Sequence, residues 1–197
     1  MKLVNIEAFE FDELDEKAKS NVRNSMSEMI DLTFMVEEFE QDLEAKGIYE
    51  PKISYSGFWS QGDGLSFTGG VSDELIKKFI NEKDYPIIFG LKDKWDISIG
   101  IERTNSRYVH SSTVKAFVVE DRTLCKDIDN QDKYDKEIEE LLSDINSWKD
   151  KECAEMYESL EKEYYYESSD ESISELCKDN GYLFNKFGKQ INNVIVA

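Results

Sequence analysis

The chain has 197 residues, 40% apolar and 12% aromatic, and a formal net charge of −19. This length allows one well-buried core, and the aromatic content excludes a disordered tail despite 34% charged residues. No apolar run approaches the roughly 20 residues of a membrane span, and no cationic leader precedes an apolar stretch at the start. Three widely spaced cysteines, Cys125, Cys153 and Cys177, form no Cys-x-x-Cys pair. We therefore expect a cytoplasmic protein with reduced thiols.

The negative charge is concentrated in two flanks. Residues 1–50 carry 14 acidic and 5 basic side chains, residues 51–120 carry 9 of each, and residues 121–197 carry 20 and 10. Such flanks repel the phosphates of nucleic acids and attract basic protein surfaces. The alternative is that acidic helices only keep the protein in solution.

The first flank, residues 12–47, has the pattern of an amphipathic helix. Acidic residues at positions 12–16 suit a helix N-terminus, and Gly47 suits a helix end. Between them, apolar residues recur at spacings of three and four: Val22, Met26, Met29, Leu32, Val36, Phe39 and Leu43. The alternative is a break near residues 25–27 that divides the segment into two helices.

The middle, residues 52–119, has the patterns of an antiparallel sheet. Residues 52–58 and 64–70 read as strands joined by a glycine-rich turn, and residues 95–101 alternate as a half-buried strand. Residues 108–119 would pair back as a second hairpin arm. Ser72 precedes acidic residues as a helix N-cap does, which predicts a helix over 73–81.

The second flank, residues 131–180, predicts a long helix and a short one. Apolar residues from Tyr134 to Tyr164 recur at helical spacing, and the opposite face is nearly all charged. A short helix would begin after Ser169 and end at Asn180 and Gly181. Residues 3–11, 182–184 and 191–196 could each add a strand. We expect a single α+β domain over 1–197, with an antiparallel sheet packed against long acidic amphipathic helices.

The glycine-rich segment between the first two strands is the most specific local pattern. It is first of all a turn, and otherwise a loop that touches a ligand or partner. If residues 108–110 form a strand, Tyr108 and His110 share one face. Should that face meet the loop, Tyr108, His110, Gln61 and Asp63 could line a polar pocket. The alternative is a histidine at a hairpin end that is hydrogen-bonded to a neighbour. The candidate ligand or partner site comprises Gly57, Trp59, Gln61, Gly62, Asp63, Gly64, Tyr108 and His110.

The sequence offers few parts for catalysis. His110 is the single histidine, so neither a multi-histidine metal site nor a ready serine triad is available. The glycine-rich loop lacks the lysine of a phosphate loop and opens no helix. We expect no metal, no cofactor and no enzymatic activity.

The glycine-rich segment has the pattern Ser-Gly-Phe-x-Ser-Gln-Gly-Asp-Gly-x-x-Phe at residues 56–67. The chain also contains Phe11-Asp12-Glu13-Leu14 with Lys17-Ala18-Lys19, Tyr108-Val109-His110, Leu160 to Tyr166, Ser169-Asp170-Glu171 and Asn180. These motifs resemble those of an uncharacterised family of bacteriophage and prophage proteins, loosely labelled antitoxin-like, and the glycine-rich motif is the most specific of them. The resemblance spans most of the chain, although the first helix lacks the Arg- and Trp-rich continuation of the family. It implies a phage origin, and hence the cytoplasm of a bacterial host, without implying a reaction.

These observations favour a protein that works by binding. We expect an anti-defence inhibitor of the anti-CRISPR or anti-restriction type, whose acidic helices mimic nucleic acid on a basic surface of a host or defence protein. The candidate contact residues are Glu37, Glu38, Glu40, Glu139, Glu140 and Glu155. The first rival is a small-ligand or nucleotide-binding module that uses Gln61, Asp63, Tyr108 and His110. The second is an antitoxin that neutralises a cognate toxin.

Overall fold

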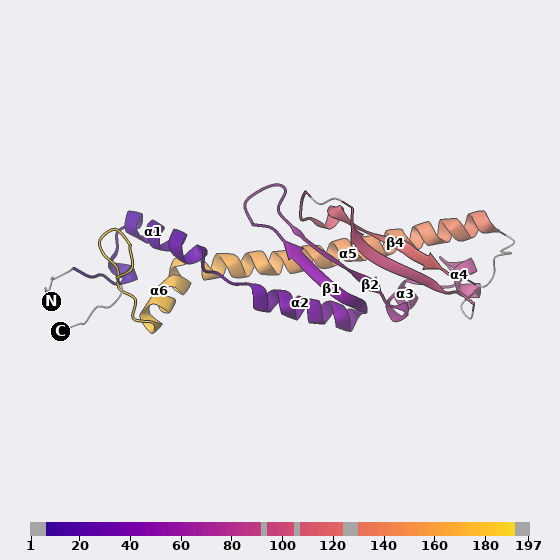
Figure 1. Cartoon of the computed structure of the whole chain (residues 1–197), viewed down its shortest axis with the longest axis horizontal. Coiled ribbons are helices and arrows are strands. Elements are labelled where there is room, and N and C mark those ends of the chain that lie inside the picture. The colour runs from indigo at the N-terminus through magenta and orange to yellow at the C-terminus, as the bar shows by residue number, and fades with distance from the viewer. Residues whose placement is uncertain (1–6, 92–93, 105–106, 124–129, 192–197) are drawn as a thin grey trace. The chain divides into compact units, whose positions relative to one another are not determined.

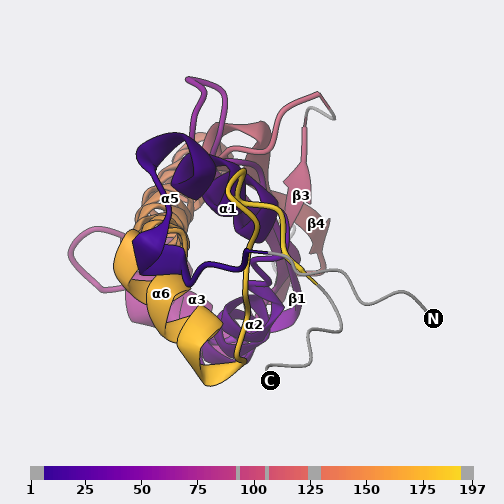
Figure 2. The same ribbon diagram turned by 90° about the vertical axis from the view of Figure 1, so that its left-hand side faces the viewer.

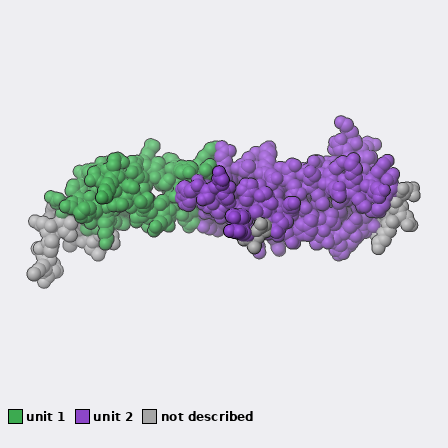
Figure 3. Space-filling view, turned by 90° about the horizontal axis from the view of Figure 1, so that it is seen from above, with its two compact units in different colours: residues 1–32, 160–197 green, residues 33–159 purple. Residues whose placement is uncertain are grey.

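A computed structural model describes residues 7–91, 94–104, 107–123 and 130–191. The chain divides into two compact units, one of residues 1–32 with 160–197 (unit 1) and one of residues 33–159 (unit 2), coloured separately in Figure 3. Compactness alone does not measure whether two units unfold separately. The single domain expected over 1–197 therefore stays a prediction.

Unit 2 is built on a four-stranded antiparallel sheet of neighbouring strands, β1 (Ile48–Tyr55), β2 (Leu65–Val71), β3 (Ile97–Arg103) and β4 (Val114–Asp121), in that order (Figure 1). β1 and β2 are joined by the glycine-rich loop. α3 (Asp73–Phe79) and α4 (Pro86–Gly90) lie between β2 and β3, and the 3-10 turn η2 (Ser111–Thr113) immediately precedes β4. β2 and β3 pair only over residues 69–71 and 99–101.

The long helix α5 (Gln131–Glu167) packs along one face of this sheet (Figure 1). The Trp148 ring meets Phe67 of β2 and Phe79 of α3 edge-on, with centroid separations of 6.2 and 6.4 Å. Leu141 and Ile145 are fully buried between helix and sheet. The apolar stripe of α5 thus forms the core of unit 2.

Helix side chains bond the backbone at both edges of the sheet. The carboxylate of Glu40, on α2 (Thr33–Lys46), accepts from the Ile53 N–H of β1 at 2.9 Å. At the opposite edge, the amide oxygen of Asn146 accepts from the Ala116 N–H of β4 at 3.0 Å. Edge strands expose backbone groups that invite pairing with other chains, and these contacts occupy part of each edge.

Unit 1 brings together segments from the two ends of the chain. The turn η1 (Phe11–Glu13), α1 (Glu16–Ser27) and α6 (Asp170–Asp179) share a small core. Phe9 and Phe184 exchange backbone hydrogen bonds of 2.8 Å, so the N- and C-terminal segments lie side by side (Figure 2). The residues of this core are Phe11, Leu14, Ala18, Val22, Met26, Ile173, Cys177 and Phe184.

The α+β class and the long helix are confirmed, and so are several element ends. Gly47 follows α2 with φ +108°, Ser72 caps α3 through Leu75 N–H, and Ser169 caps α6. The prediction of one continuous helix over 12–47 is wrong, because residues 28–32 separate α1 from α2. The two helices belong to different units and pack in different cores. The predicted alternative of two helices is the observed one.

Three strand predictions need correction. Residues 108–113 form an irregular segment and η2, because their polar groups bond one another locally, and β4 begins only at Val114. Residues 182–184 give an isolated bridge at Phe184 instead of a strand. Within residues 3–11, only residues 7–11 are described, and they contain a single β-bridge, at Phe9, instead of a strand. The strand predicted over 191–196 lies outside the described residues from position 192 onward.

Within the described ranges, no helix has the length and apolar content to cross a membrane.

Candidate functional site

The glycine-rich loop between β1 and β2 is held by hydrogen bonds within itself. Asp63 turns its carboxylate inward and accepts from the backbone N–H groups of Trp59 and Ser60 at 2.9 and 2.7 Å. Ser56 closes the base of the loop, since its N–H donates to Gly64 O and its hydroxyl accepts from Gly64 N–H, at 3.0 and 3.1 Å. The loop therefore has a defined shape without a ligand.

α5 anchors the same loop through aromatic residues. The Tyr157 hydroxyl donates to the Gly57 carbonyl at 2.8 Å. The buried ring of Phe58 lies between Tyr55 and Tyr157, with centroid separations of 6.1 and 5.4 Å. Trp59 follows directly and is 70% exposed. A large apolar side chain is thus presented to solvent by an ordered loop.

The structure brings Tyr108 and His110 against the loop. A Cβ added to Gly62 would lie 3.5 Å from the Tyr108 ring, and one added to Gly64 would lie 2.8 Å from the His110 ring. His110 serves as N-cap of η2, where its Nδ1 accepts from the Ser112 N–H at 3.1 Å. The imidazole and the Asp63 carboxylate are thus both engaged in local structure, while Gln61 and Tyr108 are exposed.

Five of the six predicted acidic contact residues are exposed. Glu37 and Glu38 lie on α2, and Glu139, Glu140 and Glu155 lie on α5. The sixth needs correction, because Glu40 is half-buried and its carboxylate accepts from the edge of β1. Helical spacing alone does not reveal this, since the strand that receives Glu40 begins only after Gly47.

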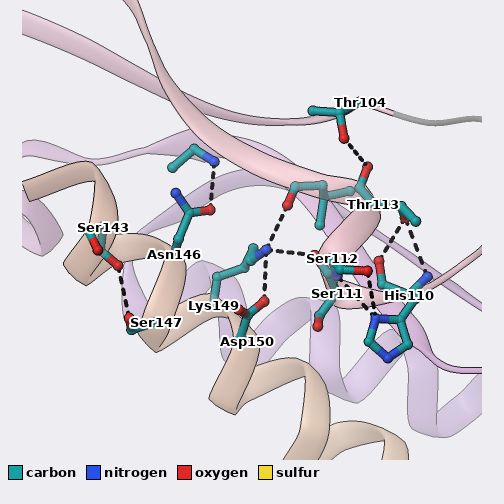
Figure 4. A network of polar contacts seen from close by, with 12 residues as sticks. Thr104, His110, Ser111, Ser112, Thr113, Ser143, Asn146, Ser147, Lys149 and Asp150 are labelled. Carbon is teal, nitrogen blue, oxygen red and sulfur yellow. Dashed lines mark hydrogen bonds and ion pairs between the residues drawn. The ribbon is translucent and has the colours of Figure 1, made fainter. Parts of the chain in front are cut away.

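Sequence reasoning missed a buried cation, Lys149, on α5 (Figure 4). Only 2% of its side chain is exposed, and its ammonium donates to the carbonyl oxygens of Ser111 and Val114, both at 2.7 Å. Asp150 approaches to 2.9 Å and is itself half-exposed. Lys149 therefore ties the segment that follows His110 to the long helix.

A second missed residue is Glu137, whose carboxylate is buried. It accepts from the N–H groups of Ile87 and Ile88 at 2.8–3.0 Å, so it caps the start of α4 from another helix. The sequence did contain a signal for both residues, because each is a charged residue at a position of α5 where the helical spacing predicts burial. The buried row of i, i+4 positions consists of Glu137, Leu141, Ile145, Lys149 and Cys153.

The comparisons with known proteins give one match. Residues 32–170 match the family described as "Domain of unknown function (DUF8835)". Neither the search of curated proteins nor that of solved structures finds a match. The matched range contains unit 2, and with it the glycine-rich loop, Lys149 and all six acidic candidates. Residues 1–31 and 171–197, which include α1 and all of α6 except Asp170, lie outside it.

Proposed function

The chain belongs to the DUF8835 family, and we propose that it acts by binding, as an anti-defence inhibitor of the anti-CRISPR or anti-restriction type. Its acidic helices would dock on a basic, nucleic-acid-binding surface of a host or defence protein and occupy it in place of nucleic acid. The motif resemblance to phage and prophage proteins supports this setting. The family itself supplies no activity, so the residues carry the proposal.

The observation that carries the proposal is the acidity of α2. Its 14 residues hold five acids and one base, Lys46, which is paired with Glu152 at 2.6 Å. The exposed carboxylates of Glu37, Glu38 and Glu44 have no hydrogen-bond or ion-pair partner within the described part of the chain. An ordered helix with unneutralised carboxylates attracts a basic surface and speeds the encounter with it.

The acids of α5 support the same function more weakly. Glu140 lies 3.4 Å from Lys136, and Glu155 lies 3.6 Å from Lys151, in exposed i, i+4 pairs. Such pairs stabilise little and reduce the local negative charge. We therefore assign the larger share of the electrostatic attraction to α2.

Two of the four polar groups of the rival small-ligand function are partly used in hydrogen bonds within the chain. Asp63 accepts from the loop backbone, and His110 Nδ1 accepts from Ser112. The antitoxin hypothesis also invokes a basic protein partner, and the identity of this partner distinguishes it from an anti-defence role.

The test is capture of a partner and competition with DNA. Wild-type protein would be immobilised and exposed to bacterial lysate at 50 mM and 500 mM salt. We expect a basic, DNA-binding protein that is retained only at low salt and releases DNA when our protein is added. An affinity independent of salt would contradict the proposal, because attraction between exposed charges is screened within about 10 Å at 0.1 M salt.

Two triple variants that remove equal charge test whether the acids of α2 are the ones that contact the partner. Glu37→Gln, Glu38→Gln and Glu44→Gln remove three charges from α2, while Glu171→Gln, Glu175→Gln and Asp179→Asn remove three from α6. We expect the α2 variant to bind the captured partner at least about tenfold more weakly at 50 mM salt. The α6 variant should be close to wild type. Equal losses in both would mean that net charge alone matters, and would contradict docking through α2.

A further inference from the structure

A groove of about 160 Å³ lies between α2 and α5 within unit 2. Its floor is apolar, with Leu43 and Met156 buried and Phe39 half-buried. Three carboxylates surround this floor, from Asp42 on α2 and from Glu152 and Glu155 on α5. The groove thus joins the two acidic helices of the proposed docking surface.

One basic side chain of this protein, that of Lys46, already lies in the groove and pairs with a carboxylate there. Lys46 belongs to the lining, and its ammonium lies 2.6 Å from the Glu152 carboxylate, whose side chain is only 12% exposed. This pair neutralises one of the three carboxylates. Asp42 has no hydrogen-bond or ion-pair partner among the residues that the structure describes. Glu155 has Lys151 at 3.6 Å, an exposed pair that holds weakly.

We infer that this groove receives an arginine side chain of the partner protein. The inference rests on the proposed function, because it specifies which basic group the acidic surface recognises. The aliphatic part of an arginine would cover Leu43 and Met156, and its guanidinium would reach Asp42 and Glu155 beside the Phe39 ring. A planar guanidinium donates to two carboxylates and stacks on an aromatic ring, whereas a lysine ammonium is a strongly hydrated point charge. Arginine is therefore the better occupant of a groove that is both apolar and acidic.

The floor of the groove contains a reporter for this binding. Protein labelled with ¹³C at the methionine methyl groups would be titrated with a hexa-arginine peptide at 20 mM salt. We expect the Met156 methyl signal to move and that of Met26, in the core of unit 1, to stay. A hexa-lysine peptide should shift Met156 several-fold less at equal concentration. Equal shifts with both peptides would contradict the preference for arginine.

Two charge-matched double variants separate the groove from the general electrostatics. Asp42→Asn with Glu155→Gln removes the two carboxylates of the groove that Lys46 leaves free. Glu171→Gln with Glu175→Gln removes two exposed charges from α6, which lies outside the proposed docking surface. We expect the first pair to weaken hexa-arginine binding about tenfold and the second less than about threefold. Thermal unfolding of both variants would check that the fold is intact.

The outcomes distinguish the two proposals. Equal weakening by both double variants, with salt-dependent binding retained, would overturn the arginine groove and leave acidic docking in place. Failure of the wild-type protein to bind either basic peptide at 20 mM salt would overturn acidic docking as well. A shift of Met156 that survives the Asp42→Asn and Glu155→Gln changes would also contradict the groove, because these carboxylates are the groups that would hold the guanidinium.

Discussion

The ammonium group of Lys149 lies in the interior of unit 2, where a lone charge would be strongly unfavourable. Two backbone carbonyls at 2.7 Å and the Asp150 carboxylate at 2.9 Å provide it with three acceptors. Its role is structural, since it holds Ser111, the first residue of η2, and Val114, the first residue of β4, against α5. It also fixes the segment that presents Tyr108 and His110 to the glycine-rich loop.

We predict that Lys149→Met destabilises the protein by about 1–3 kcal/mol, because it leaves the buried Val114 carbonyl without its ammonium donor, whereas the Ser111 carbonyl keeps the Val114 N–H. Urea unfolding followed by circular dichroism measures this change. The matched control is Lys151→Met, two residues along the same helix, where 74% of the side chain is exposed. The control should change the free energy of unfolding by less than about 0.5 kcal/mol. Similar effects of both substitutions would show that the Lys149 contacts contribute no net stability.

At the same scale, the sequence predicts which residues are charged but not which charges are used internally. Glu37, Glu38 and Glu40 look equivalent as a run of acids, yet only Glu40 faces a strand edge. Asp63 looks like a ligand group, yet its Oδ2 accepts from two backbone N–H groups of its own turn. Pairings of this kind depend on segments far along the chain or on loop geometry, and a spacing pattern contains neither.

Among the elements, the β1–β2 loop combines a fixed backbone with exposed aromatic rings. Gly64 permits the approach of the segment 109–110, whose Val109 carbonyl and His110 ring would lie 3.1 and 2.8 Å from an added Cβ. Gly62 has looser surroundings, with the Tyr108 ring at 3.5 Å. Neither glycine has a positive φ, so the two positions differ only in the space available for an added Cβ.

We predict that Gly64→Ala destabilises the protein by about 1–3 kcal/mol, because the new methyl group forces the backbone at 109–110 to move. Gly62→Ala should stay within about 0.5 kcal/mol of wild type, since 3.5 Å is an ordinary contact. Thermal unfolding of the two variants gives the comparison. Equal costs for both glycines would mean that the loop does not pack against the 109–110 segment as described.

Element ends marked by local chemistry were predictable. Ser72, Ser169 and Gly47 cap or end helices through contacts with residues two to four positions away, which a sequence pattern includes. The break at residues 28–32 and the irregular segment 108–113 were not predicted as such, although two helices were an alternative for 12–47. In residues 28–32 the apolar spacing of the neighbouring helices continues, and in residues 108–113 the strand-like alternation continues. Packing decides the conformation of the first segment, and local hydrogen bonds decide that of the second. Strand alternation placed Tyr108 and His110 on one face and left their contact with the loop as a condition, and the structure makes this contact without a strand there.

At the scale of the whole molecule, the range matched by the family model, residues 32–170, nearly coincides with unit 2, residues 33–159. Unit 2 lies entirely within residues 32–170, and α1 and most of α6 lie outside that range. The proposed docking surface and the arginine groove belong to unit 2. The proposed binding through α2 would therefore use the part of the chain that the family model matches, whereas residues 1–31 and 171–197 of unit 1 lie outside the match.

The two buried cysteines make it possible to test whether the units unfold separately. Cys177 belongs to the eight-residue core of unit 1, and Cys153 lies in unit 2. Burial raises the pKa of the Cys153 thiol to about 12 and also raises the pKa of Cys177, so neither should react with iodoacetamide in the folded protein at pH 8. Alkylation resolved by mass spectrometry then reports the opening of each unit.

We predict that Cys177 becomes reactive at a urea concentration at least about 1 M below that for Cys153. The core of unit 1 is small and is closed by segments from opposite ends of the chain, and small cores are marginally stable. Complete and equal alkylation of both thiols in 8 M urea is the control for intrinsic reactivity. Coincident midpoints would contradict separate opening, and would instead show that residues 1–197 unfold as the single domain expected from the sequence.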